Sequence, residues 1–406
     1  MDIFNQDFFI NNRARLRTLF TGTAPIILSG NGVLQQTSDN TFPFKQDSSF
    51  WYFTGIDEPD ILLVMDRNKE YLVLSNRHRF SEIADGAIDP EKLTKISGIK
   101  TVLDFQEGSR ILSNRLKRSK HAAILSAPPA YIEEYGFYTN PARAHLNNRI
   151  KQINPEIQFL DIRNHIVKLR SIKQPLELET INKAIDISIK TFKNIKKNIN
   201  KYEYEYEIEA LVLSEFRKNQ AKPAYSSIVA SGINACTLHY SKNNSKLMGS
   251  ELVLIDVGAD FNHYAADITR TYSRAKPTKR QNQVLNSVLE VQNYALDQLK
   301  EGIDFKTYET NIEHFMGERL RELGLIKTID RESVRKYYPH STSHFLGLDP
   351  HDVGDYTMPL KENMVITVEP GIYIPEEKIG IRIEDDILIT KNGYKNLSAS
   401  LPSSFI

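Results

Sequence analysis

The sequence predicts a mixed α/β (α+β) protein with two domains, the second of which consists of two similar halves. Short continuous apolar runs in the first part of the chain are typical of strands covered on both faces. Further along, two helices followed by a β-hairpin occur twice in succession. Between these parts, Pro175 suits the first turn of a long amphipathic helix. In a chain of 406 residues we therefore expect domains over residues 1–168 and 169–406.

The individual elements follow from local patterns. The apolar runs APIILS, DILLVM, EYLVLS and HAAILS predict four strands of the first domain. In the second domain, apolar residues recur at helical spacing in four segments, which predict helices over residues 175–197, 204–219, 278–300 and 305–323. Sequence identity between the two halves is negligible, so the duplication is inferred from the order of the elements alone.

Charge and composition argue against several classes of partner. The chain carries 52 basic and 51 acidic residues, a net charge of +1, which gives no electrostatic reason to bind nucleic acid or a membrane surface. No apolar run approaches the roughly 20 residues that span a bilayer, and the N-terminus lacks the apolar segment of a secretory signal. The single cysteine, Cys236, cannot form an internal disulfide. We therefore expect a reducing, cytoplasmic environment.

The first predicted hairpin brings two aspartates together. It covers the stretch LVLIDVGADFNHYAADITRTYS, which contains Asp256 and Asp267. A turn at residues 261–262 places these two aspartates directly opposite each other. Side chains of cross-strand partners share one face of the hairpin, so the two carboxylates are expected to converge.

The second predicted hairpin repeats this arrangement with two glutamates. A turn at residues 376–377 places Glu369 opposite Glu384, and His344 lies between the two hairpins in the sequence. Four carboxylates and one imidazole need cations, because uncompensated charges are costly to bury together. Two divalent ions match the four carboxylates in charge, so the sequence predicts a two-metal hydrolase site. This oxygen-rich ligand set favours Mn²⁺ over a zinc site built on cysteine and histidine.

Further polar residues lie near these candidate ligands. Arg382 precedes Glu384 by two residues, shares its face of the strand, and is placed to orient its carboxylate. His239, in SGINACTLHY, and His351, in HDVG, are candidates to hydrogen-bond a substrate carbonyl or a tetrahedral intermediate.

The residues alone leave two points open. Any one of the three acids at 384–386 could simply be solvated, because a one-residue slip in register moves a side chain to the other face. His340 and His344 form an H-x-x-x-H pair, which is one feature of zincin helices. The zincin interpretation is disfavoured, because Ser341 stands where that motif requires glutamate.

A series of blocks in the chain resembles a known family. The segment FKQDSSFWYFTGIDEPDILLVM is similar to the N-terminal domain of aminopeptidase P. The blocks SIVASGINACTLHY, LIDVGADFNHYAADITRTY, SHFLGLDPHDVG, TVEPGIYI and GIRIEDDILIT resemble its catalytic blocks in the same order. The chain thus resembles the aminopeptidase P family of metallopeptidases. The resemblance implies a creatinase/aminopeptidase P-type N-terminal domain followed by a pseudo-twofold pita-bread catalytic domain.

The resemblance also implies a division of labour among the five ligands. By this resemblance, Asp256 binds one metal ion, while His344 and Glu369 bind the other. Asp267 and Glu384 bridge the two ions. Glu369 also serves as the proton shuttle for a metal-bridging hydroxide.

Five further residues match family positions around the metal ions. By the same resemblance, His239, His340 and His351 handle the substrate or the reaction intermediate. Arg382 and Tyr373 match positions that surround the glutamates. We therefore count Arg382 and the three histidines, together with Glu369, as candidate catalytic residues.

The implied activity is removal of an N-terminal residue when proline follows it. The implied partners are peptides with proline in the second position, and the implied assembly is a homodimer or homotetramer. Two segments depart from the family pattern. RHRFSEIADGAIDPEKL is short and lacks tryptophan, and DYTMPLKENM lacks an arginine of close relatives. These departures bear on whether the chain recognises longer peptides and whether it forms the tetramer of some family members.

Three other functions are compatible with parts of this pattern. A prolidase, which cuts only Xaa-Pro dipeptides, would use the same metal ligands. Hydrolysis of the creatine type on the same fold is disfavoured, because it does not use this ligand set. A non-catalytic peptide-binding module is disfavoured too, since such relatives lose ligands and all five candidates are present here.

Overall fold

The computed structural model describes residues 3–67, 69–76, 82–84, 86–126 and 136–405. The chain separates into two compact units, Met1–Leu169 (the N-terminal unit) and Arg170–Ile406 (the C-terminal unit). Part of the segment RHRFSEIADGAIDPEKL, at residues 77–81 and 85, lies outside the described residues. Among the helices that the structure describes, none combines the length and the apolar content needed to cross a membrane.

The N-terminal unit contains a six-stranded sheet in the order β4-β3-β2-β1-β5-β6. Strand β2 runs antiparallel to both of its neighbours, and the remaining pairs are parallel. The four predicted strands are confirmed as β1, β2, β3 and β5. Strands β4 and β6 were not predicted, because one has only two residues and the other is largely exposed. The strands are β1 Ile26–Ser29, β2 Leu62–Asp66, β3 Lys69–Val73, β4 Val102–Leu103, β5 His121–Ile124 and β6 Gln158–Asp161.

Helices of the N-terminal unit begin at short polar side chains. Asn5, Asp47, Asp89 and Asp104 each accept a hydrogen bond from a backbone N–H group in the first turn of the helix that follows. Apolar faces of these helices pack on the sheet. The helices are α1 Gln6–Leu19, α2 Ser48–Thr54, α4 Pro90–Ser97, α5 Phe105–Lys117, α7 Ala142–Ile153 and α8 Arg163–Arg170.

The C-terminal unit repeats the order of two long helices and then strands, as predicted, and its second half has an additional short helix, α13, that was not predicted. Its first half has α9 Pro175–Asn198, α10 Glu205–Lys218, β7 Lys222–Pro223, β8 Ile228–Ser231, β9 Leu252–Asp256, β10 Ala259–Phe261, β11 Tyr264–Ala265 and β12 Thr269–Ser273. Its second half has α11 Lys279–Gln298, α12 Phe305–Glu322, α13 Arg331–Tyr337, β13 Val365–Val368, β14 Gly371–Ile374, β15 Ile379–Arg382, β16 Asp385–Thr390 and β17 Gly393–Asn396.

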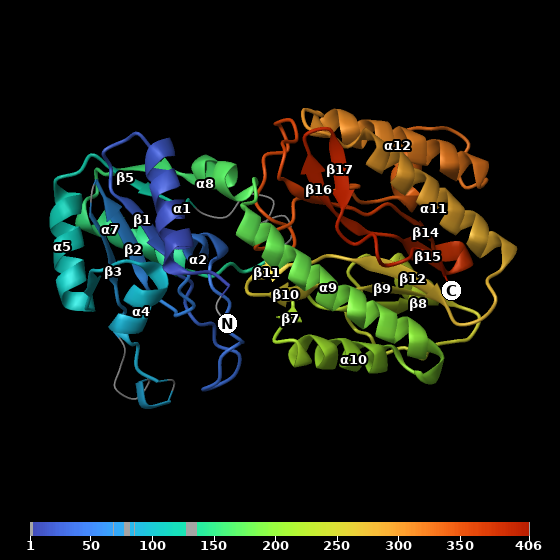
Figure 1. Cartoon of the computed structure of the whole chain (residues 1–406), viewed down its shortest axis with the longest axis horizontal. Coiled ribbons are helices and arrows are strands. Elements are labelled where there is room, and N and C mark those ends of the chain that lie inside the picture. Colours follow the sequence, from blue (N-terminus) through green and yellow to red (C-terminus); the bar gives the residue numbers. More distant parts are fainter. Residues whose placement is uncertain (1–2, 68, 77–81, 85, 127–135, 406) are drawn as a thin grey trace. The chain divides into compact units, whose positions relative to one another are not determined.

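The four long helices α9, α10, α11 and α12 confirm the four predicted ones, with ends that differ by one or two residues. In Figure 1, α11 and α12 lie along one side of the strands of this unit and α10 along the other. The second half has a large apolar core, in which Val288, Ile312 and Met316 from the helices pack with Ile366 and Ile387 from the strands. This core fixes the strands whose ends carry the candidate ligands.

The predicted turn of the first hairpin is wrong by one residue. The turn lies at Asn262 and His263, which both have left-handed backbone angles, φ 47° and 71°. Such angles match the twist of a hairpin, and asparagine adopts them more readily than most residues. Asp256 is therefore paired with Thr269 rather than with Asp267. This register differs by two residues from the predicted one, so the side chains keep their faces.

The predicted register of the second hairpin is confirmed. Strands β14 and β15 pair Gly371 with Arg382, and β13 pairs with β16 in the same register, Val368 with Asp385. Carried through the gap between these two ladders, that register places Glu369 opposite Glu384.

We predict that Gly258→Ala disrupts the first hairpin. A Cβ atom at Gly258 would lie 1.7 Å from the backbone oxygen of Ala266, so the two strands would have to separate. The variant should lower the free energy of unfolding by more than about 3 kcal/mol in urea denaturation. Gly393→Ala is the matched control, because its Cβ meets no described atom within 4 Å. Equal stability of the two variants would contradict the register given above.

Candidate metal centre

The five predicted ligands lie at strand ends and in one loop. Asp256 ends β9 and Asp267 precedes β12, while Glu369 follows β13 and Glu384 precedes β16. His344 lies in the loop after α13. One ligand atom from each of Asp267, His344 and Glu384 lies within 4.8 Å of the others, and all three residues are buried. His344 Nε2 is 3.4 Å from Glu369 Oε1 and 3.7 Å from Asp267 Oδ2. The structure therefore gathers these side chains in one place.

Asp256 joins this group through a tyrosine that the sequence did not single out. The hydroxyl of Tyr225 lies 2.6 Å from Asp256 Oδ1 and 2.5 Å from Asp267 Oδ1. One hydroxyl has a single proton to donate, so it binds one carboxylate at a time or is shared between them. Tyr225 comes just before β8, which pairs with β9 beside Asp256. The pairing of β8 with β9 is what brings Tyr225 to the two aspartates, and a local sequence pattern does not indicate it.

Arg382 provides the guanidinium group at the site. It donates to Asp256 Oδ2 at 2.6 Å, to the Tyr373 hydroxyl at 2.8 Å and to Thr269 Oγ1 at 3.0 Å. Thr269 donates in turn to Glu384 Oε2 at 2.6 Å. Arg382 thus contacts Asp256 directly and reaches Glu384 only through Thr269, whereas the strand pattern had suggested a direct contact with Glu384.

The acids that follow Glu384 have other partners. Asp385 forms a 2.6 Å ion pair with the buried Arg270. Asp386 accepts the backbone N–H of Asp267 at 3.2 Å, and its other oxygen is buried without a hydrogen-bond partner in the described part of the chain. Of these three acids, Glu384 is therefore the one that lies with Asp267 and His344. The predicted hairpin register had also selected Glu384.

The histidines of the site are held as neutral rings. Burial lowers the pKa of His344, and likewise of His340, to about 3. His344 Nδ1 lies 3.1 Å from the backbone oxygen of Phe345 and so carries the proton, which leaves the lone pair of Nε2 toward the carboxylates. The ring of His351 stacks on that of His344 at 3.9 Å between centroids.

The other two predicted histidines lie beside these groups. His340 Nε2 is 2.8 Å from the Tyr373 hydroxyl, and its Nδ1 is 3.7 Å from Glu369 Oε2. His239 and His351 are exposed residues. Partial desolvation of the His351 ring against its neighbours, and then the nearby His239, lowers the pKa of His351. The nearness of His239 also contributes to lowering the pKa of His340. His340 and His344 therefore lie beside the carboxylates, His351 stacks on His344, and His239 lies near His340 and His351.

The carboxylates themselves fit divalent cations. Burial raises the pKa of Asp267, and the adjacent Asp256 raises it further. Burial likewise raises the pKa of Glu384, and the nearby Asp267 raises it further. Burial also raises the pKa of Glu369, and the nearby Glu384 raises it further. Buried acids of this kind hold protons unless cations replace them. Carboxylate oxygens with one imidazole suit divalent metal ions.

Two acids, the half-buried Glu309 and the buried Asp352, hold the loops that carry the histidines, and neither was predicted. The carboxylate of Glu309, on α12, accepts the backbone N–H groups of Thr342 and Ser343 at 2.9 and 3.0 Å, next to His344. Asp352, next to His351, forms buried ion pairs. No local pattern in the sequence indicates Glu309, because its partners lie 33 and 34 residues further along the chain.

The ion pairs of Asp352 tie the HDVG loop to the start of the C-terminal unit. Lys173 Nζ lies 3.1 Å from Asp352 Oδ2, and Arg170 Nη2 contacts Asp352 Oδ1. All three side chains are almost fully buried. Removing one member would leave an uncompensated buried charge, so the cluster fixes the position of the loop.

Comparisons with known proteins agree with this geometry. The sequence model of metallopeptidase family M24 matches residues 179–391, and that of the N-terminal domain of aminopeptidase P matches residues 9–125. The Xaa-Pro aminopeptidase of Haemophilus influenzae is 33% identical over 97% of this chain and 94% of its own length. That of Escherichia coli is 32% identical over 98% of this chain and 96% of its own length.

A solved structure has the same fold. Zinc-substituted aminopeptidase P of E. coli in complex with product superposes with a TM-score of 0.86 at 28% identity, over 99% of this chain and 96% of that one. The fold and the clustered ligands define a metal-dependent aminopeptidase, an exopeptidase that uses divalent ions. The chain belongs to metallopeptidase family M24 and shares the two-part organisation of aminopeptidase P. The resemblance found in the sequence is thus confirmed.

We predict that Tyr225→Phe weakens metal binding without unfolding the protein. The variant removes the hydroxyl that lies between Asp256 and Asp267 and orients both carboxylates. Loss of such an outer contact lowers metal affinity by about 10- to 100-fold, measurable by competition with a coloured chelator. Tyr206→Phe is the control, since Tyr206 is exposed on α10. An unchanged affinity in the Tyr225 variant would contradict this role.

We also predict that Glu309 makes stability depend on pH. Burial raises its pKa from the ordinary 4.5 to about 7, so the folded protein binds this proton more tightly than the unfolded chain. Its favourable contribution is complete below pH 4.5 and is lost as the pH rises through about 7. In the Glu309→Gln variant, position 309 cannot ionise, so the variant does not lose this contribution to stability as the pH rises. Its stability relative to wild type should therefore rise by up to about 3 kcal/mol over that interval.

The measurement is urea denaturation of both proteins at several pH values. Glu301→Gln, an exposed position just before α12, is the control and should show no such trend. A constant difference between the Glu309 variant and wild type across this interval would show that the acid does not titrate there.

Proposed function

We propose that this chain is an Xaa-Pro aminopeptidase, which removes the N-terminal residue from peptides with proline in the second position. One observation carries the proposal. Ligand atoms of Asp267, His344 and Glu384 lie within 4.8 Å of one another. They do so in a chain whose similarity to an Xaa-Pro aminopeptidase extends over 97% of this chain and 94% of that protein. The domains would be residues 1–168 and 169–406, in a cytoplasmic homodimer or homotetramer.

In this proposal five side chains hold two divalent ions, Mn²⁺ foremost. Asp256 serves one ion, His344 and Glu369 serve the other, and Asp267 with Glu384 serves both. The nearness of Asp267 to His344, and of His344 to Glu369, supports this assignment. When bound, such ions lower the pKa of water and polarise a carbonyl group. Mn²⁺ suits the oxygen-rich ligand set better than ions that favour thiolate ligands.

Glu369 is proposed to move the proton of the reaction. Burial first, and then the nearby Glu384, raises the pKa of its carboxyl group, which favours its acceptance of a proton. Its Oε2 lies 3.7 Å from His340 Nδ1. Glu369 can therefore accept a proton from water at one carboxylate oxygen and deliver it to the leaving nitrogen.

Two exposed histidines are proposed to bind the substrate. His239 and His351 are exposed beside the carboxylates, so each can donate a hydrogen bond to a peptide carbonyl or to the tetrahedral oxygen that forms from it. The chain of contacts from His340 through Tyr373 to Arg382 fixes Asp256 from the other side. The nitrogen before proline carries no hydrogen. Recognition must then depend on the carbonyl and on the ring.

The test is hydrolysis of Xaa-Pro-Yaa-Zaa peptides and of Xaa-Pro dipeptides, with and without added Mn²⁺. We expect cleavage of the longer peptides, and loss of at least about 10³-fold in kcat for Asp267→Ala with the fold retained. Asp297→Ala, an exposed position on α11, is the control and should keep full activity. Exclusive cleavage of dipeptides would identify a prolidase instead. No cleavage and no metal binding would leave only a peptide-binding module.

A further inference from the structure

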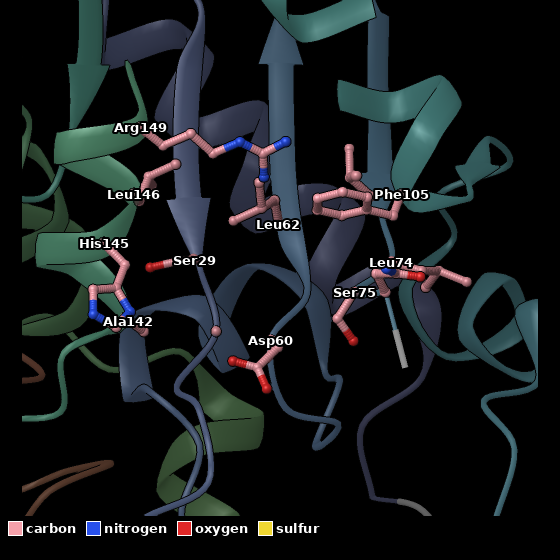
Figure 2. A pocket seen from close by; sticks show the side chains of 13 residues that line it. Ser29, Asp60, Leu62, Leu74, Ser75, Phe105, Ala142, His145, Leu146 and Arg149 are labelled. Atoms are coloured by element: carbon pink, nitrogen blue, oxygen red, sulfur yellow. The ribbon is translucent and has the colours of Figure 1, made fainter. Parts of the chain in front are cut away.

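The polar groups around the cavity of the N-terminal unit do not converge on a ligand. The cavity has a volume of about 210 Å³, and Figure 2 shows Arg149 at one end of it and Asp60 at the other. The hydroxyl oxygens of Ser29 and Ser75 are buried, so a ligand in the cavity cannot reach them. Polar groups do converge in the C-terminal unit, on the carboxylate of Glu205, which is not one of the candidate metal ligands.

Glu205 is a buried acid at the first residue of α10, with 0% of its surface exposed. Its Oε1 atom accepts the backbone N–H and the hydroxyl of Ser231, both at 2.8 Å, and the side-chain amide of Asn234 at 3.1 Å. Its Oε2 atom accepts the hydroxyl of Tyr240 at 2.8 Å and the backbone N–H of Ser245 at 2.9 Å. Five donors thus meet at one carboxylate, and both of its oxygens are used.

These donors all lie on the chain between the end of β8 and the start of β9, which also carries His239. The backbone N–H of Thr237 donates to the oxygen of Asn234 at 2.9 Å, and that of Tyr240 donates to the oxygen of Thr237 at 3.2 Å. The chain turns twice between Asn234 and Tyr240 and leaves His239 exposed. The carboxylate of Glu205 therefore holds both ends of the turn that presents this imidazole.

The other side of this turn rests on strands of the metal centre. A Cβ atom at Gly380, on β15, would lie 2.3 Å from the backbone oxygen of Ala235, so the two backbones are in close contact. Tyr240 belongs to the same apolar cluster as Tyr373, and the hydroxyl of Tyr373 accepts a hydrogen bond from Arg382 at 2.8 Å. The turn is thus held between the buried carboxylate and the strands that carry the site.

We propose that Glu205 is a positioning residue, which holds His239 where its imidazole can donate to a substrate carbonyl or to the tetrahedral oxygen. The inference rests on the proposed function, in which His239 binds the substrate. Donors whose direction is fixed in advance stabilise developing charge without reorganisation during the reaction. Hydrogen bonds to a carboxylate are roughly twice as strong as those between neutral groups, so Glu205 gives an exposed ring on a loop this fixed direction.

The test is a double-mutant cycle in the metal-loaded full chain. Glu205→Gln leaves one acceptor oxygen and turns an NH₂ group toward other donors, so it loosens the turn. It should lower kcat/KM for an Xaa-Pro-Yaa-Zaa peptide by about 10- to 100-fold. In the His239→Ala background the same change should cost less than about 3-fold, because no imidazole is left to misplace. An equal loss in both backgrounds would show a purely structural role and overturn the proposal.

Glu207→Gln is the matched control on the same helix. The carboxylate of Glu207 accepts the backbone N–H groups of Glu203 and Tyr204, at the start of α10, and the variant should keep wild-type activity in both backgrounds. Tyr240→Phe removes one of the five donors and keeps the aromatic ring, so it tests the proposal if Glu205→Gln does not fold. We expect a smaller loss of kcat/KM, again only while His239 is present.

Hydrogen–deuterium exchange separates this proposal from the proposed function. Peptides from residues 231–245 should exchange at least about 10-fold faster in Glu205→Gln than in wild type, whereas Glu207→Gln should match wild type. If the wild type cleaves no Xaa-Pro peptide, the proposed function fails, and the exchange rates still decide whether Glu205 holds this segment. Unchanged exchange in Glu205→Gln would overturn the positioning role even in an active enzyme.

Discussion

The mutual repulsion of buried carboxylates is the constraint on which this catalytic unit depends. Burial is the largest cause that raises the pKa of Asp267 and of Glu384, and a neighbouring carboxylate raises each further, Asp256 in the case of Asp267 and Asp267 in the case of Glu384. The protein offsets part of this repulsion itself, because Arg382 donates to Asp256 and Tyr225 donates into the Asp pair. One guanidinium cannot balance four carboxylates. Divalent ions would supply the missing positive charge, which is why this group of carboxylates suits them.

The duplicated hairpins explain how distant acids meet without a long loop. In each half one acid lies at or just after the end of a strand and another lies shortly before the returning strand, so each half contributes a pair. This is why the sequence could predict the arrangement: periodicity and hairpin register are local properties. The one-residue error in the predicted turn of the first hairpin did not change which side chains were expected to share a face. Pairing Asp256 with Thr269 shifts the register by two residues, and a shift of two preserves the face of every side chain.

What the sequence could not predict are contacts that depend on packing between distant elements. Tyr225 lies beside Asp256 only because β8 pairs with β9. Glu309 lies on α12 and would be expected to face solvent, yet it accepts two backbone N–H groups of the loop before His344. Asp352 was part of a recognised block, but its buried partners Arg170 and Lys173 precede α9. No local pattern links these residues, and a single sequence holds no pairing information for them.

The two loop anchors differ in how their charge is balanced, and this difference bears on function. Asp352 has two cationic partners, Arg170 and Lys173, and it holds the His351 loop through these buried ion pairs. Glu309 has chiefly backbone N–H donors, and burial raises its pKa to about 7. A neutral carboxyl group accepts these hydrogen bonds less strongly than a carboxylate does. The loop that carries His344 is therefore held more firmly above that pH than below it, although the buried charge then costs stability.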